Sequence, residues 1–119
     1  MVKDNLNNHE VVKLTQELIR IPSHKYVDNR ESDVAEFIYD YCKKNGLEVE
    51  FQKVEGKRRN VIAKLRGNGT GKSLIFSGHT DTVPPYEMTI EPFSGEIKDG
   101  YVLGRGANDM KGAVACMIT

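Results

Sequence analysis

A histidine and an aspartate two residues apart follow an apolar run that has the composition of a buried strand. They are His79 and Asp81, in the stretch FSGHTDTVPP. Side chains two apart on an extended backbone project to the same side, and strand ends in open sheets are where sites tend to form. A carboxylate beside an imidazole can accept one ring N–H and leave the other nitrogen to bind a metal ion. The pair suits a metal ligand and the group that orients it. The structural alternative is a hydrogen-bonded histidine and an aspartate that accepts turn amides.

A second candidate is Asp109, in the stretch GRGANDMKG. It stands where a glycine-rich loop meets the start of an expected helix. Taken alone, this position favours an N-cap, whose carboxylate accepts the first amides of the helix. The functional alternative is a metal ligand, because one carboxylate has two oxygens and can bridge two divalent cations.

Other polar motifs indicate no site. The stretch GNGTGKS is similar to a phosphate-binding loop, but it lacks the first glycine of that pattern and a strand-like run follows it instead of a helix. His9 lies in a helical pattern and His24 in a polar loop, and neither has metal-ligating partners at a telling spacing. We expect both histidines to lie at the solvated surface.

Two amphipathic helices are expected in the first half of the chain. The first begins near Asn7 as N-cap and ends before Pro22, and the second begins at Ser32 as N-cap and stops at Gly46. The residues at helical spacing are Val11, Leu14, Leu18 and Ile21 in the first helix, and Val34, Phe37, Ile38, Tyr41 and Cys42 in the second. A third helix is expected to begin at the MKGAVACMIT segment.

The strands follow the second helix. Leu47, Val49 and Phe51 alternate with polar residues and predict a half-exposed strand. NVIAKLRG and KSLIFSG, joined by GNGTG, predict a further hairpin, and Asp99-Gly100 between two short alternating runs predicts a tight one. This order of elements predicts the α/β class, with a mixed sheet flanked by helices.

Composition limits the kinds of partner. The 119 residues are enough for one core, and nothing in them reads as a linker or repeat, so we expect a single unit. Seventeen basic residues balance seventeen acidic ones, so no broad positive field attracts nucleic acid or anionic lipid. No apolar run is long enough to span a bilayer, and the first residues lack the centre of a signal peptide. We expect neither nucleic acid nor a membrane as partner.

The two cysteines are Cys42 and Cys116. One lies in a helical pattern and the other in an apolar run, which indicates buried free thiols in a reducing compartment. We therefore expect a cytoplasmic protein.

Two stretches together carry a family resemblance. SGHTDTVPP and the later PFSGEIKDGYVLGRGANDMKGA resemble the aminoacylase, acetylornithine deacetylase, succinyl-diaminopimelate desuccinylase and glutamate carboxypeptidase family of dinuclear zinc peptidases. The opening LTQELIRIPS extends the resemblance over nearly the whole chain. Both motifs, and the hairpin between them, occur in the family's order.

The resemblance implies a role for each candidate. His79 would be a ligand to one zinc ion, Asp109 would bridge two ions, and Asp81 would be a catalytic aspartate that orients His79. The Asp109–Met110 peptide would be cis. The cofactor would be two divalent metal ions, zinc or alternatively cobalt. They would activate a water that hydrolyses an amide bond of an N-acyl amino acid or small peptide.

The resemblance also implies that parts of such an enzyme lie elsewhere. The family's general base belongs to a Glu-Glu pair that does not occur here, and its remaining metal ligands are expected beyond Thr119. The lid or dimerisation domain of the family is absent as well. We therefore expect residues 1–119 to be the amino-terminal part of the catalytic domain, inactive alone, with a full-length parent that forms a homodimer. The alternative is a non-catalytic remnant or association module that keeps the scaffold.

Overall fold

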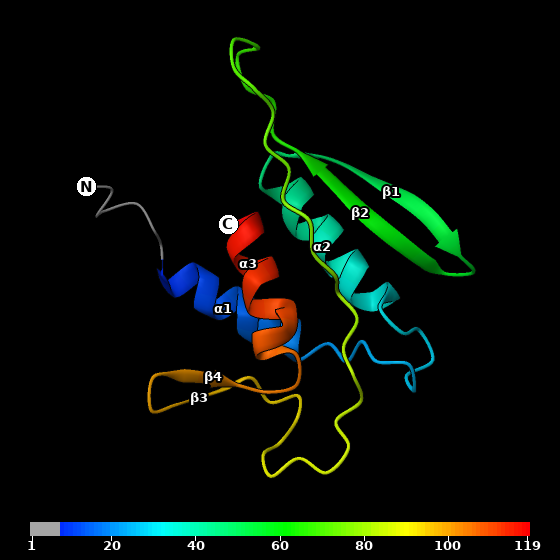
Figure 1. Ribbon diagram of the computed structural model, residues 1–119, viewed down its shortest axis with the longest axis vertical. Coiled ribbons are helices and arrows are strands. Elements are labelled where there is room, and N and C mark those ends of the chain that lie inside the picture. Colours follow the sequence, from blue (N-terminus) through cyan, green and yellow to red (C-terminus); the bar gives the residue numbers. More distant parts are fainter. Residues whose placement is uncertain (1–7) are drawn as a thin grey trace.

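The computed structural model describes residues 8–119, in which three helices build the core (Figure 1). They are α1 (Asn8–Ile19), α2 (Ser32–Lys44) and α3 (Gly112–Ile118). The buried core side chains are Leu14, Leu18, Val34, Ile38, Cys42, Val114 and Ala115. The apolar faces predicted for the first two helices are confirmed, because their residues supply most of this cluster. The predicted cap Asn7 lies outside the described residues.

The predicted N-cap role of Ser32 is wrong. Glu31 occupies the cap position of α2, and no side chain caps the helix there. The Ser32 hydroxyl instead donates to the carbonyl of Lys57, 2.9 Å away in the turn of a hairpin. A serine that can reach a distant carbonyl therefore ties the start of α2 to the sheet.

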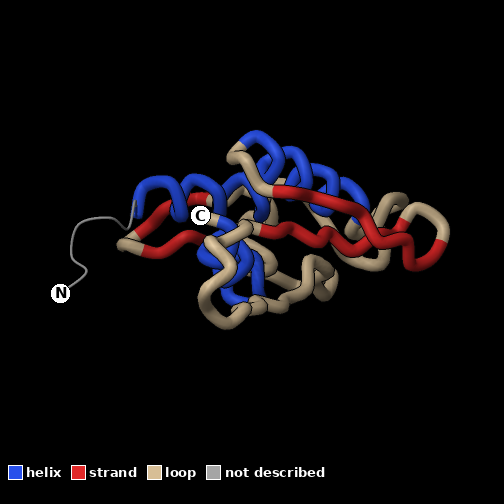
Figure 2. The backbone as a smooth tube through the Cα atoms, turned by 90° about the horizontal axis from the view of Figure 1, so that it is seen from above, coloured by secondary structure: helices blue, strands red, loops and turns tan. Residues whose placement is uncertain are grey.

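That hairpin consists of β1 (Glu48–Glu55) and β2 (Arg58–Lys64), which pair antiparallel. It runs along one side of α2, as Figure 2 shows. The Tyr39 ring on α2 stacks on the Phe51 ring of β1 with centroids 4.3 Å apart. The alternation predicted for this part of the chain is confirmed.

A second hairpin lies against α1. Its strands are β3 (Glu96–Lys98) and β4 (Tyr101–Leu103), and the turn residues Asp99 and Gly100 have φ of 52° and 82°. Two left-handed residues in succession match the right-handed twist of a two-residue hairpin, as the Asp-Gly pair predicts. The described strands form two separate two-stranded antiparallel sheets. The predicted α/β class is confirmed, but these strands do not join into the expected mixed sheet, because each pairs only with its hairpin neighbour.

Residues 65–81, which we call the arm, connect β2 to the second half of the chain. The chain reverses its direction beyond the end of β2 and returns past α2 (Figure 1). The strand predicted for KSLIFSG is wrong: the segment has no ladder partner, and Leu74, Ile75 and Phe76 are exposed. Strand composition alone does not make a strand, because the backbone also needs a neighbour to bond with.

The base of the arm is attached to the residues after α1. The Ser23 hydroxyl donates to the Thr80 carbonyl at 2.7 Å, and the Thr82 amide donates to the Ser23 carbonyl at 3.2 Å. His24 pairs with Thr82 in a parallel bridge, and its ring stacks on Phe93. The prediction that His24 is a surface residue is therefore wrong, while the His9 side chain lies outside the described part.

The cysteines are free, but only one is buried. Cys42 is buried in the core as predicted, whereas Cys116 is exposed, which contradicts the prediction. Val114 and Ala115 turn toward the core, so the next residue along α3 faces away. None of the helices in the described part of the chain is long and apolar enough to cross a membrane.

Candidate metal centre

His79 and Asp109 meet although thirty residues separate them along the chain. His79 lies at the end of the arm, and Asp109 lies in η1 (Ala107–Lys111), the turn segment that precedes α3. The distance from His79 Nε2 to Asp109 Oδ1 is 3.0 Å. The structure therefore brings together the two residues predicted as metal ligands.

Asp81 contacts the other nitrogen of the same ring. His79 Nδ1 lies 3.0 Å from the main-chain carbonyl of Asp81 and 3.4 Å from its carboxylate Oδ1. A carbonyl can only accept, so Nδ1 carries a proton and donates it. This fixes the orientation of the ring and aims Nε2 at Asp109. The backbone of Asp81 makes the shorter of its two contacts with the ring.

The surroundings of the His79 ring favour a positive charge on it. Partial burial opposes that charge, but the hydrogen bonds and the negative charges of Asp81 and Asp109 outweigh it and raise the pKa of His79 above 6.5. Both ring nitrogens face oxygen atoms, so a positive charge on the ring would be stabilised on both sides. A metal ion bound to Nε2 would meet the carboxylate of Asp109 in the same way.

Asp109 does not act as the helix cap that its position favours. Its φ of −129° and ψ of 92° are extended, the residue that precedes α3 is Lys111, and no side chain caps that helix. The Asp109–Met110 peptide is cis, as the family resemblance implies. The Asp109 carboxylate is 81% exposed and points to His79.

Met110 holds the arm against η1. Its sulfur accepts the His79 amide at 3.4 Å, and a Cβ added to Gly78 would come within 2.9 Å of the Met110 methyl carbon. A larger residue at position 78 would force the end of the flexible Met110 side chain to shift. The spacing of the sequence motifs gave no sign of this contact, because it depends on which segments become neighbours in the fold.

The pair fits a divalent cation that binds nitrogen and oxygen. Imidazole and carboxylate ligands bind zinc at about 2.0–2.2 Å, so two ligands of one tetrahedral ion lie about 3.3 Å apart. The observed 3.0 Å between Nε2 and Oδ1 is close to that separation. No cluster of three or more His, Cys, Asp or Glu side chains able to hold a metal occurs among the described residues. Further ligands are therefore needed for a full set.

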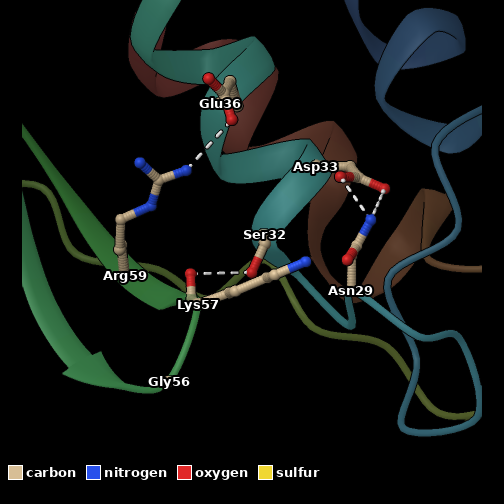
Figure 3. Close-up of a pocket in the computed structure, with 7 residues that line it drawn as sticks. All are labelled: Asn29, Ser32, Asp33, Glu36, Gly56, Lys57 and Arg59. Atoms are coloured by element: carbon tan, nitrogen blue, oxygen red, sulfur yellow. Dashed lines mark hydrogen bonds and ion pairs between the residues drawn. The ribbon is translucent and has the colours of Figure 1, made fainter.

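A hollow lies elsewhere, between the start of α2 and the β1–β2 turn (Figure 3). It measures about 420 Å³, and none of the three candidate residues lines it. Some of its polar groups are paired with one another, Arg59 with Glu36 at 3.1 Å and Asn29 with Asp33 at 3.2 Å, whereas the buried Nε of Arg59 has no hydrogen-bond partner among the described residues. We place the candidate metal site at His79 instead, because the two predicted ligands His79 and Asp109 meet there.

Comparison with known protein families gives one match. Peptidase family M20/M25/M40 matches residues 75–119, the segment that contains all three candidate residues.

Relatives match over most of the chain. A succinyl-diaminopimelate desuccinylase of Methylorubrum extorquens is 41% identical in an alignment of 118 positions that covers 95% of this chain and 30% of that protein. Proteins of the same name from Wolbachia pipientis subsp. Culex pipiens and a Bradyrhizobium species are 40% and 37% identical. They cover 90% and 92% of this chain, and 26% and 29% of their own lengths. The chain thus spans less than a third of these relatives, and the family resemblance seen in its motifs is confirmed.

Proposed function

We propose that this chain, as a member of peptidase family M20/M25/M40, is the amino-terminal part of the catalytic domain of a metal-dependent hydrolase. The reaction is hydrolysis of an amide bond in an N-acyl amino acid or small peptide. The names of the relatives favour an N-succinyl amino acid such as succinyl-diaminopimelate. The observation that carries the proposal is the 3.0 Å approach of His79 Nε2 to Asp109 Oδ1.

The residues of this chain have distinct parts in that site. His79 and Asp109 would hold zinc, or alternatively cobalt, and the second oxygen of Asp109 would be available to a second ion. Asp81 would keep the His79 ring in the tautomer that leaves Nε2 for the metal. A bound ion would supply an activated water and polarise the substrate carbonyl.

The 119-residue chain alone would bind metal weakly and hydrolyse nothing. Two protein ligands are fewer than the three or four typical of zinc sites. The general base and the remaining ligands are proposed to lie in sequence that follows Thr119 in a longer parent, which would act in the cytoplasm as a homodimer.

The test uses the complete product of the reading frame that contains this chain. It should cleave succinyl-diaminopimelate, acetylornithine or a simple dipeptide, lose the activity on chelation, and regain it with zinc or cobalt. Asp109→Asn should abolish turnover, whereas Asp99→Asn, an exposed aspartate in the β3–β4 turn, should leave it unchanged. A metal-loaded protein that cleaves none of these amides would end the proposal.

A second candidate function rests on the arm. Its apolar side chains at Leu74, Ile75 and Phe76 are exposed, which suits an association module that keeps the scaffold without catalysis. The reading frame separates the two: a Glu-Glu pair and a late histidine after Thr119 favour the enzyme, and a stop codon at that point favours the module.

A further inference from the structure

Lys111 is a fully buried lysine two residues after Asp109. Its side chain is among the largest in the core and only 1% exposed. Lysine is almost never buried to this extent unless it is paired, because its charge loses hydration. Burial lowers the pKa of Lys111 to about 8. A side chain kept in so costly a place indicates a specific contact.

The contact is with the end of α1. Lys111 Nζ donates to the carbonyl of Leu18 at 2.8 Å and to that of Ile21 at 2.6 Å. The last carbonyls of a helix lack partners within the helix and carry partial negative charge. The last turn of α1 has no basic residue of its own, so Lys111 supplies the cation from a distant part of the chain.

The stem of Lys111 packs under the loop that leads to Asp109. The Lys111 amide donates to the Gly106 carbonyl at 2.8 Å. A Cβ added to Gly106 would lie 3.3 Å from Lys111 Cδ and 2.6 Å from Thr82 Cγ2. Lys111 therefore lies where η1 meets the residue that follows Asp81.

The carboxylate of Asp109 makes few contacts of its own. Its carboxylate is mostly exposed, and its one recorded side-chain contact within the described residues is with His79. The direction of this carboxylate must then come from the backbone of η1, which is non-helical at Asp109 and Met110 and is anchored at its end by Lys111.

We propose that Lys111 is the positioning residue of the metal site. Its ammonium group anchors η1 to the end of α1 and so keeps the Asp109 carboxylate against the His79 ring. Lys111 touches neither the metal nor the substrate, and it acts through Asp109. This inference rests on the proposed function, since it concerns how that site is held.

The test compares Lys111→Met with Val34→Ala in the 119-residue chain. Methionine keeps the apolar stem and removes the ammonium group, while Val34→Ala opens a cavity in α2 without altering η1. Two quantities are followed by NMR: the nuclear Overhauser contact between the His79 ring and the Asp109 β-protons, and the shift of the ring nitrogens on titration with Zn²⁺. Trimethylamine N-oxide is added to both variants because it favours the folded state.

Lys111→Met should lose the His79–Asp109 contact and weaken Zn²⁺ binding by about tenfold or more. Val34→Ala, at a stability comparable to that of Lys111→Met, should keep both the His79–Asp109 contact and the affinity for Zn²⁺. Lys111→Arg should recover part of that affinity. If Lys111→Met keeps the contact and the affinity, the lysine only stabilises the fold and the inference is overturned. If the wild-type chain shows the contact but Zn²⁺ never shifts the His79 ring, residues 1–119 alone do not form the metal site, and the chelation test on the complete product decides the proposed function. Loss of the contact in Lys111→Met still supports positioning in that case.

Discussion

The two halves of the candidate site stand on supports of very different strength. Asp109 belongs to η1, which is joined to the three-helix core through the buried Lys111. His79 ends the arm, whose apolar residues face solvent and whose backbone joins no ladder. One partner is therefore held by the core of this chain, and the other by a few contacts at the base of the arm.

The contrast teaches that the position of a candidate ligand is fixed by the burial of the segment that carries it, and not by the sequence motif to which it belongs. The arm carries the stronger sequence motif but the weaker structural support. Its end is secured by contacts of Ser23 with Thr80, of Ser23 and His24 with Thr82, and of Met110 with His79. The following predictions measure the difference between the two regions.

The largest effect is expected from truncating the core. Leu18→Ala removes a side chain that is fully buried in α1 and should lower the free energy of unfolding by about 2–5 kcal/mol. Ile75→Ala on the arm, where the side chain is 85% exposed, should change it by less than about 0.5 kcal/mol. Urea titrations followed by circular dichroism measure both. Equal losses would mean that the arm is packed in solution.

A smaller effect is expected at the base of the arm. Ser23→Ala removes the hydrogen bond to the Thr80 carbonyl and should cost about 1 kcal/mol. Limited proteolysis within residues 65–81 should become faster, because the arm loses a tether. Ser73→Ala, at an exposed position of the arm, is the matched control. Unchanged cleavage in Ser23→Ala would show that other contacts suffice.

An effect confined to high pH concerns Tyr41, whose hydroxyl donates to Glu10 at 2.7 Å and so links α2 to α1. Burial and the Glu10 carboxylate raise the pKa of Tyr41 from 10.0 to about 12. The folded state then holds this proton more tightly than the unfolded state, so the related stability is complete below pH 10 and is lost as pH rises to 12. Absorbance titration of tyrosinate should show a late component that Tyr41→Phe removes. A late component that persists in this variant would assign it elsewhere.

Much of the fold could be predicted from local sequence patterns, because each pattern determines the structure of a single helix or turn. The apolar spacing of α1 and α2 and the Asp99-Gly100 turn each satisfy their own geometry with neighbouring residues. The arm differs because a strand needs a partner that local composition does not supply. The burial of His24 could not be predicted locally either, because its partners Phe93 and Thr82 come from a distant part of the chain.

The site was predictable from the family resemblance and only in part from the residues themselves. Spacing indicated that His79 and Asp81 share one side, but the approach of Asp109 depends on tertiary structure. Lys111 gave no signal at all, because a buried lysine and a surface lysine look alike in a sequence. Its partners are carbonyl groups, which every residue carries.

The different exposure of the two thiols has a practical consequence for measuring these variants. The chain contains no tryptophan, so the usual fluorescence probe of unfolding is missing. In the native protein a maleimide should modify Cys116 alone, because Cys42 is sealed in the core and burial raises the pKa of its thiol. After Cys116 is replaced by serine, the rate of Cys42 alkylation would report how often the core opens far enough to expose this thiol. The measurement needs no optical signal.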